Sequence, residues 1–264
     1  VVSFRDLFFA RPHTGMEDVM AHDPVAVRPQ SDREVVAELI ERYRLLAIPV
    51  TDEAGHLKGM VRFDEAMEAV REEIGEDLTQ MVGAGAEETV FTPIPVSVRR
   101  RLPWITFNLL IGLMLAFAIE PFRETIQEYP ILAALMPMVA LLGGNSGAQS
   151  QAVIIRAMAI GDLPPGRAWR AVRREFAVGA INGAAMSIMA GLVVALIAPD
   201  PDIGVVVGVA VFVSLLVAGL AGAGIPVIMR RLGLDPALAS NIFLTMITDL
   251  VGFTGFLLTA TLLL

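Results

Sequence analysis

Long apolar stretches follow one another in the second half of the chain, whereas the first half alternates short apolar and polar segments. A helix of about 20 apolar residues crosses the roughly 30 Å hydrocarbon core of a bilayer. The pattern therefore predicts five membrane-spanning helices, at residues 102–119, 131–160, 176–198, 203–229 and 237–264.

Arginine is distributed unequally between the loops that connect these predicted helices. Nine arginines lie directly before the first helix (residues 99–101), between the second and third, and directly after the fourth, and one arginine lies in the loops on the opposite side. Because cytoplasmic loops carry an excess of Lys and Arg, the N-terminal half is expected in the cytoplasm and the C-terminus outside. A buried helical bundle in a large soluble protein, the alternative, would not show this alternation.

The first half has the pattern of alternating strands and helices. Apolar runs predict a strand at residues 23–29 and a hairpin at residues 47–63 with its turn at residues 53–55. Apolar positions at helical spacing predict a helix over residues 31–45 with Ser31 as its N-cap, and a second helix from Asp64. The expected buried face of the first helix consists of Val35, Leu39, Ile40 and Tyr43.

The composition supports the division of the chain into two halves and excludes several classes of function. Hydrophobic residues make up 55% of the 264 residues, and residues 1–98 contain 19 acidic and 9 basic residues against 9 and 11 in the remainder. The chain contains no cysteine, which excludes a disulfide framework and thiolate metal sites. Neither a nucleophile beside a base nor a phosphate-binding loop is recognisable, so we expect neither an enzyme nor a nucleic-acid partner.

A polar, glycine-rich motif, LLGGNSGAQSQ at residues 141–151, interrupts the second apolar stretch. Irregular or polar backbone at membrane depth is tolerated only where it is buried in protein or lines a water-filled path. Gly144 and its neighbouring glycines would allow close backbone approach and free carbonyls, and Asn145 offers a neutral oxygen ligand. A small-residue packing seam would also explain the glycines, but it leaves Asn145, Gln149 and Gln151 unexplained.

The fifth apolar stretch contains Asp249 near its middle, without a basic residue in the same predicted helix. An ionised carboxylate there costs at least about 2.5 to 3.5 kcal/mol on insertion scales. Asn241, Thr245 and Thr248 fall on roughly the same helical face as Asp249. Mg²⁺ suits this set, because it binds through one or two carboxylates and keeps several waters. A proton-relay acid and a protonated structural aspartate are the alternatives for Asp249.

Motifs in the first half resemble a cystathionine-β-synthase (CBS) domain. They are VMAHDPVAV, IPVTDEAGHLKGMV and the Phe63-Asp64 pair that starts the last helix. The resemblance implies a CBS domain at residues 13–78. It also implies that residues 1–12 are the remnant of a preceding repeat, the rest of which lay before Val1. Many CBS pairs bind adenine nucleotides through a Ser or Thr at a position that Arg62 occupies here, so the resemblance assigns no nucleotide to this repeat.

The apolar half resembles the MgtE family of magnesium channels. The resemblance rests on PMVALLGGNSGAQSQAVIIRAMAIGDL (137–163), RLGLDPALASNIFLTMITDLVGFTG (231–255) and RLPW before the first stretch. It implies an α/β CBS domain, a cytoplasmic linker at residues 79–101 and an all-α domain of five transmembrane helices at residues 102–264. It further implies a homodimer that lies in the lipid of a prokaryotic plasma membrane. The dimer would pass partly hydrated Mg²⁺ through a pore at the dimer interface. Whether other divalent cations also pass is left open.

The resemblance also places two sets of site residues. The pore would be lined by Asp249, Asn145, Asn241, Gly144 and Thr245. Acidic residues crowd the last CBS helix and its exit, where like charges four residues apart repel by a few tenths of a kcal/mol per pair and a divalent cation would relieve the repulsion. The implied regulatory Mg²⁺ sensor comprises Asp64, Glu65, Glu68, Glu73, Glu76, Asp77 and, as a partner in the membrane half, Glu175.

Three alternatives stay open at this point. The acidic helix could be a solvated charged surface without a bound ion. The membrane half could be a secondary Mg²⁺ exchanger that couples Mg²⁺ flux to another gradient. The whole chain could be a CBS sensor that is anchored in the membrane and transports nothing.

Overall fold

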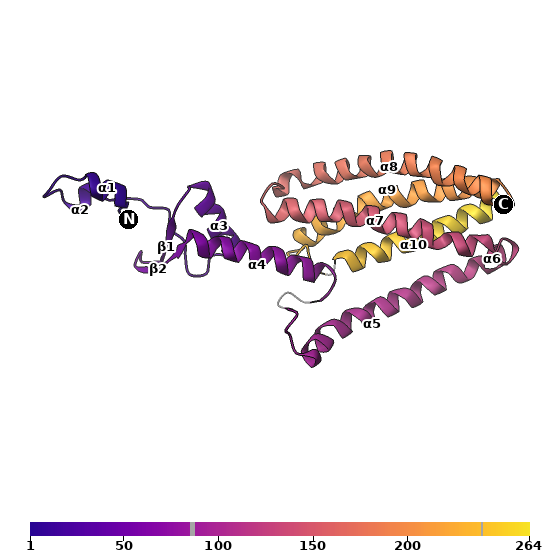
Figure 1. Cartoon of the computed structure of the whole chain (residues 1–264), viewed down its shortest axis with the longest axis horizontal. Coiled ribbons are helices and arrows are strands. Elements are labelled where there is room, and N and C mark those ends of the chain that lie inside the picture. The colour runs from indigo at the N-terminus through magenta and orange to yellow at the C-terminus, as the bar shows by residue number, and fades with distance from the viewer. Residues whose placement is uncertain (85–87, 239) are drawn as a thin grey trace. The chain divides into compact units, whose positions relative to one another are not determined.

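A computed structural model describes residues 1–84, 88–238 and 240–264 of the chain (Figure 1). The chain divides into two compact units, Val1–Gly75 and Glu76–Leu264. The predicted fold class is confirmed, because a region with a small sheet and helices is followed by long apolar helices.

The first unit contains one antiparallel hairpin and several helices, and its last helix continues past the unit boundary. The predicted hairpin at residues 47–63 is confirmed with its turn. The predicted strand at residues 23–29 is reduced to a single parallel bridge between Val27 and Val50. The elements are α1 (Phe4–Phe9), α2 (Met16–Val19), α3 (Arg33–Arg42), β1 (Ala47–Thr51), β2 (Leu57–Arg62) and α4 (Phe63–Met81).

Helix α3 buries only part of the expected face. Ile40 is fully buried and Leu39 packs against the core, as predicted. Val35 is 48% exposed, because the neighbouring Val36 turns inward instead, and Tyr43 is 53% exposed beyond the end of the helix. The helix also begins at Arg33, so Ser31 is not its N-cap; the Ser31 hydroxyl accepts the backbone N–H of Arg28 at 3.1 Å. The core of this unit is formed by Val27, Val36, Ala37, Ile40, Ile48 and Ala66.

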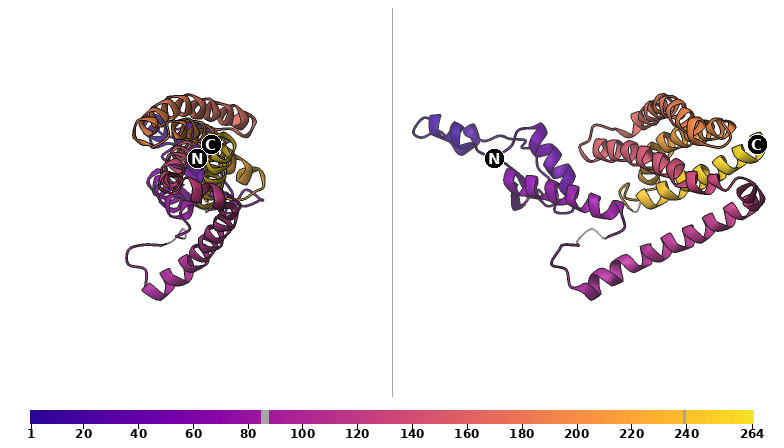
Figure 2. Two further views of the ribbon diagram at one scale, coloured as in Figure 1. Left: turned by 90° about the vertical axis from the view of Figure 1, so that its right-hand side faces the viewer. Right: turned by 45° about the vertical axis from the view of Figure 1, so that its right-hand side comes forward.

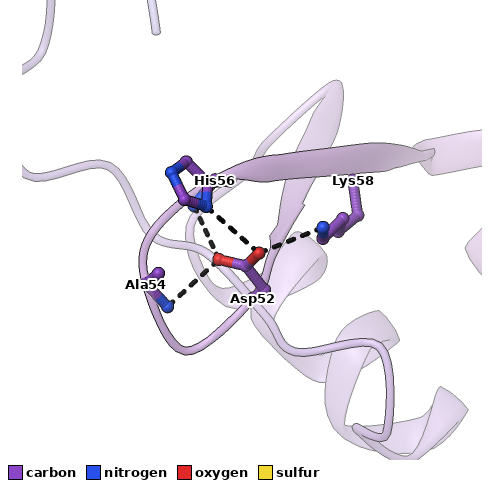
Figure 3. Close-up of polar contacts among 4 residues, drawn as sticks. All are labelled: Asp52, Ala54, His56 and Lys58. Carbon is purple, nitrogen blue, oxygen red and sulfur yellow. Dashed lines mark hydrogen bonds and ion pairs between the residues drawn. The ribbon is translucent and has the colours of Figure 1, made fainter.

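The hairpin turn is organised by the carboxylate of Asp52 (Figure 3). Its Oδ1 accepts the backbone N–H groups of Ala54 at 3.0 Å and His56 at 2.8 Å, and its Oδ2 lies 3.1 Å from the Lys58 ammonium nitrogen. Gly55 has φ 82°, a left-handed conformation that glycine adopts without steric cost. The His56 N–H and the Lys58 ammonium lower the pKa of Asp52, because both stabilise its ionised form.

The second unit is a helical bundle. Among the described residues, five helices are long and apolar enough to cross a membrane. Two of them, α5 and α8, begin earlier than the apolar stretches that predicted them, because the helices extend through arginine-rich segments. The elements are α5 (Ile94–Ile119), η1 (Glu120–Phe122), α6 (Arg123–Glu128), α7 (Ile131–Ala159), η2 (Pro165–Arg167), α8 (Ala168–Ile197), α9 (Asp202–Arg231) and α10 (Ser240–Leu263).

Helix α9 is the centre of the bundle and packs against α7, α8 and α10 (Figure 1). Glycines allow the backbones of α8 and α9 to touch: a methyl group at Gly219 would lie 2.6 Å from the carbonyl oxygen of Glu175. Such small-residue seams are typical of helices that associate in lipid. Helix α5 lies at the edge of the bundle (Figure 2) and packs chiefly against α10.

Candidate functional site

A groove of about 350 Å³ lies between α5 and α10. Asn241, Thr245 and Asp249 are spaced four residues apart on α10 and line it together, as the sequence predicted for these three residues. Asn108 of α5 faces them across the groove. The full lining consists of Val82, Asn108, Ile111, Gly112, Leu115, Asn241, Ile242, Thr245 and Asp249.

Apolar contacts hold the two walls of the groove together. The rings of Phe107 and Phe243 meet edge to face with their centroids 5.9 Å apart. Ile111 and Leu115 of α5 and Ile242 of α10 are buried against one another beside this ring pair. Because both helices are of membrane-spanning length, the groove places amide, hydroxyl and carboxylate oxygens where hydrocarbon surrounds the outer surface.

The electrostatics of the groove favour a cation. None of the described residues that line it is basic, and Asp249 is half-buried. The Thr245 hydroxyl donates to the backbone oxygen of Asn241 at 2.9 Å, so its lone pairs stay available to a ligand. A hard cation that keeps its waters, such as Mg²⁺, matches one carboxylate surrounded by neutral oxygens.

Thr248 does not belong to this face, contrary to the sequence prediction. Its side chain is buried, and its hydroxyl donates to the backbone oxygens of Leu244 at 3.0 Å and Thr245 at 3.2 Å. Neighbouring residues on a helix are about 100° apart, so Thr248 points into the bundle, toward Gly143, while Asp249 faces the groove.

The motif at residues 141–151 does not interrupt its helix. Helix α7 is continuous from Ile131 to Ala159, so the expected free carbonyls are wrong. The buried glycines serve helix packing instead: a methyl group at Gly147 would lie 2.7 Å from a methyl carbon of Leu244. Tertiary packing outweighs the cost of about 1 kcal/mol that each glycine adds to a helix.

Asn145 and Gly144 lie on a different part of α7 and outside the α5–α10 groove. Asn145 and Gln149, one turn apart, are both exposed, whereas Gly144 is half-buried, and a methyl group there would meet no described atom within 4 Å. Within one chain, the structure therefore does not bring Asn145 and Gly144 together with Asp249. The third carboxamide of the motif, that of Gln151, is fully buried, and its amide atoms have no hydrogen-bond partner among the described residues.

The predicted sensor residues at the start of α4 have local partners. Arg62 lies 3.0 Å from Asp64 and 3.4 Å from Glu65. Glu65 also accepts the backbone N–H of Arg62 at 3.0 Å, which caps the helix in the manner of a capping box. Glu68 is exposed and Glu76 half-buried.

In the described part of the chain, no three acidic or histidine side chains converge to hold a metal ion. The side chains of Glu73 and Asp77 lie outside the described residues. Glu175 is buried in α8 and its carboxylate is bound by Arg174, within the second unit. The sensor assignment therefore stays a prediction.

The first unit contains a cleft of about 370 Å³ with charges of both signs in its lining. Arg28 and Arg33 offer donors to an anion, while Glu65, Glu68 and Glu72 oppose one. Arg33 and Glu72 are themselves 3.7 Å apart. This mixture does not define the charge of a ligand.

Two further residues escaped the sequence prediction. Asn108 is a single carboxamide in an otherwise apolar stretch, and only the packing of α5 on α10 shows that it shares a groove with Asp249. Glu88, whose side chain is 3% exposed, accepts hydrogen bonds from Arg101 and Ser97 near the start of α5. These two donors lower the pKa of Glu88 and tie the preceding segment to α5.

Comparison with known proteins accounts for both halves of the chain. Residues 136–259 match the MgtE family, described as divalent cation transporter, and residues 16–72 match the CBS domain. The magnesium transporter MgtE of Bacillus subtilis is 34% identical over 95% of this chain. The membrane half of the chain, over residues 136–259, belongs to the MgtE family. The resemblances to the CBS domain and to MgtE that the sequence motifs indicated are thus confirmed, and the chain is an integral membrane protein.

Two further MgtE relatives agree with this assignment. The magnesium transporter MgtE of Enterococcus faecalis is 33% identical over 95% of this chain, and that of Thermus thermophilus is 35% identical over 100% of it. The chain spans 56%, 55% and 59% of the lengths of the three MgtE relatives.

Proposed function

We propose that this MgtE chain contains the pore of a homodimeric, magnesium-selective channel and part of its cytoplasmic regulatory region. The proposal places the CBS half in the cytoplasm of a prokaryotic cell and the C-terminus outside. The observation that carries it is the α5–α10 groove, in which Asp249 lies with Asn241 and Thr245 and without a basic residue among the described lining residues. The names of the relatives, which are magnesium transporters, support Mg²⁺ as the ion.

The charge of Asp249 accounts for attraction of a divalent ion into this groove. A doubly charged ion and one carboxylate about 5 Å apart attract by roughly 7 kcal/mol at an effective dielectric constant of 20, before desolvation is subtracted. That distance leaves room for a water between them, in keeping with the reluctance of Mg²⁺ to lose its waters. The neutral oxygens of Asn241 and Thr245 then bind water ligands of the ion.

Exposed polar residues support the association of the chain with a second copy of itself. Asn145 and Gln149 of α7 and Thr245 of α10 would meet hydrocarbon in a monomer. A second copy, related by a two-fold axis beside these helices, would cover these side chains and supply a second Asp249. The same arrangement would bring Asn145 and Gly144 to the ion path. Chemical cross-linking in a mild detergent should trap a dimer, and a product that is monomeric throughout would contradict this part of the proposal.

Regulation by cytoplasmic Mg²⁺ belongs to the same proposal. Carboxylates of α4 that repel one another would be drawn together by bound Mg²⁺ and would close the channel, and Mg²⁺ depletion would open it. The exposure of Asp64, Glu65 and Glu68 supports access of the ion. We assign no nucleotide to the cleft of the first unit, because charges of both signs line it and do not define the charge of a ligand.

Magnesium uptake into proteoliposomes at a clamped membrane potential tests the proposal. We expect a flux that follows the potential without a sodium or proton gradient. A flux that requires such a gradient would identify a secondary exchanger instead. An absence of flux would leave a membrane-anchored CBS sensor as the function of the chain.

A further inference from the structure

We propose that Asn108 of α5 is a specificity-determining residue of the ion path, whose carboxamide binds the water shell of the passing divalent cation opposite Asp249. This inference rests on the proposed function of the groove and names its second wall. Asn108 and Gly112, one turn apart on α5, line the same groove as Asn241, Thr245 and Asp249 of α10.

The neighbours of Asn108 fix its position in the groove. Phe107 precedes it and packs on Phe243 of α10, and Ile111, one turn later, is buried with Ile242. At Gly112, a methyl group would meet no described atom within 4 Å, so there is open space beside the Asn108 carboxamide. A ligand can therefore occupy the place that a side chain at this position would fill.

The hydrogen-bonding state of Asn108 indicates a ligand. The described part of the chain offers its carboxamide no hydrogen-bond partner, although the residue lies in a helix of membrane-spanning length. The nearby Thr106 differs, because its hydroxyl donates to the backbone oxygen of Leu102 at 2.9 Å. An unpaired amide costs free energy in an apolar medium, and an ion that carries its own waters would satisfy it.

The chemistry of a carboxamide complements that of Asp249. Its carbonyl oxygen can accept a hydrogen bond from a water ligand of the ion, and because the carboxamide is neutral it adds no charge to that of Asp249. Asp249 attracts every divalent cation through its charge, whereas a neutral group at a fixed position distinguishes ions by how firmly they hold their waters. Mg²⁺ holds its waters more firmly than larger divalent cations do.

The test compares Asn108→Leu with Thr106→Val, a control that also removes a polar group from α5 but does not alter the groove. Loss of one neutral hydrogen bond should raise the KM for Mg²⁺ uptake about threefold to tenfold in Asn108→Leu. The preference for Mg²⁺ over Mn²⁺ should fall in the same variant. Thr106→Val should keep the KM and the preference of the parent chain.

Equilibrium binding of Mn²⁺ to the solubilised full chain, followed by electron paramagnetic resonance, gives a readout that does not need transport. The signal of interest is the bound Mn²⁺ that Asp249→Asn loses. Asn108→Leu should weaken this binding severalfold, and Asn108→Asp, which adds a second carboxylate, should tighten it. Size-exclusion chromatography of each variant checks folding, and Asn108→Ser replaces Asn108→Leu if the latter aggregates.

The outcomes separate this inference from the proposed function. If the parent conducts Mg²⁺ and Asn108→Leu matches it in KM, ion preference and Mn²⁺ affinity, the role of Asn108 is wrong and the channel stands. If the parent conducts no Mg²⁺, the proposed function fails. If Asn108→Leu then also binds Mn²⁺ with the affinity of the parent, the inference about Asn108 is wrong as well.

Discussion

Replacement of Gly222 by alanine tests whether the contact between α7 and α9 is as close as the structure shows. A methyl group at Gly222 would overlap the carbonyl oxygen of Gly147 and lie 3.0 Å from the Cβ of Ser150. Backbone atoms cannot rotate away as a side chain can, so the two helices would have to separate. Gly224→Ala is the matched control, because a methyl group there meets no described atom within 4 Å.

The expected size of the effect follows from the comparison of the two variants. Carbon atoms attract best at about 3.5 to 4.0 Å, so the 3.0 Å contact with Ser150 alone demands a separation of roughly 0.5 Å or more. Overpacking of this kind costs about 1 to 3 kcal/mol. Both variants gain about 1 kcal/mol of helix propensity, which cancels in the difference. Gly222→Ala should therefore be about 1 to 3 kcal/mol less stable than Gly224→Ala.

Unfolding by sodium dodecyl sulfate in mixed micelles measures this difference. Trp104 on α5 and Trp169 on α8, the two tryptophans of the chain, report the transition by fluorescence. Equal free energies of unfolding for the two variants would refute the close backbone contact. The same result would leave Gly222 without a role in the packing of α9 on α7.

Two other predictions concern the N-terminal half of the chain. Asp52→Asn should lower the thermal stability of the CBS unit at pH 7. The pKa of Asp52 is lowered from 3.8 in the folded state, so the ionised carboxylate stabilises the parent above pH 3.8. The difference in stability between parent and variant should disappear as the pH falls through the lowered pKa. A pH series of melting curves checks this, and identical curves at pH 7 would contradict it. Exchange of Glu65, Glu68, Glu73 and Glu76 for glutamine should remove the protection that Mg²⁺ gives the linker against protease, whereas unchanged protection at every Mg²⁺ concentration would return α4 to a solvated surface.

The parts of the fold that the sequence predicted depend on long or regular patterns. The five apolar stretches exceed what a soluble helix needs, so their number and order were predictable. The β1–β2 hairpin was predictable because an apolar alternation encloses a turn with Gly55, whose φ is 82°. The three α10 residues of the groove were predictable because polar side chains four residues apart share one face of any helix.

The errors arise where a local pattern is ambiguous and tertiary packing decides. Val35 and Val36 are equally apolar, and only the packing of α3 determines that Val36 is buried. The glycines of α7 disfavour a helix locally, yet contacts with α9 and α10 keep it continuous. Thr248 resembles a groove residue by sequence but points into the bundle. Asn108 could not be assigned, because its role depends on a helix far away in the sequence.

Conduction by Asp249→Asn tests the central claim most directly. The substitution keeps the size and hydrogen-bonding capacity of the side chain and removes one charge per subunit from the groove. In proteoliposomes at a clamped potential, we expect this variant to fold and dimerise like the parent but to lose Mg²⁺ conduction. A proton-relay role would instead leave Mg²⁺ binding intact and abolish its pH dependence. If Asp249→Asn conducts Mg²⁺ like the parent across a full concentration series, the assignment of the α5–α10 groove to the pore is wrong.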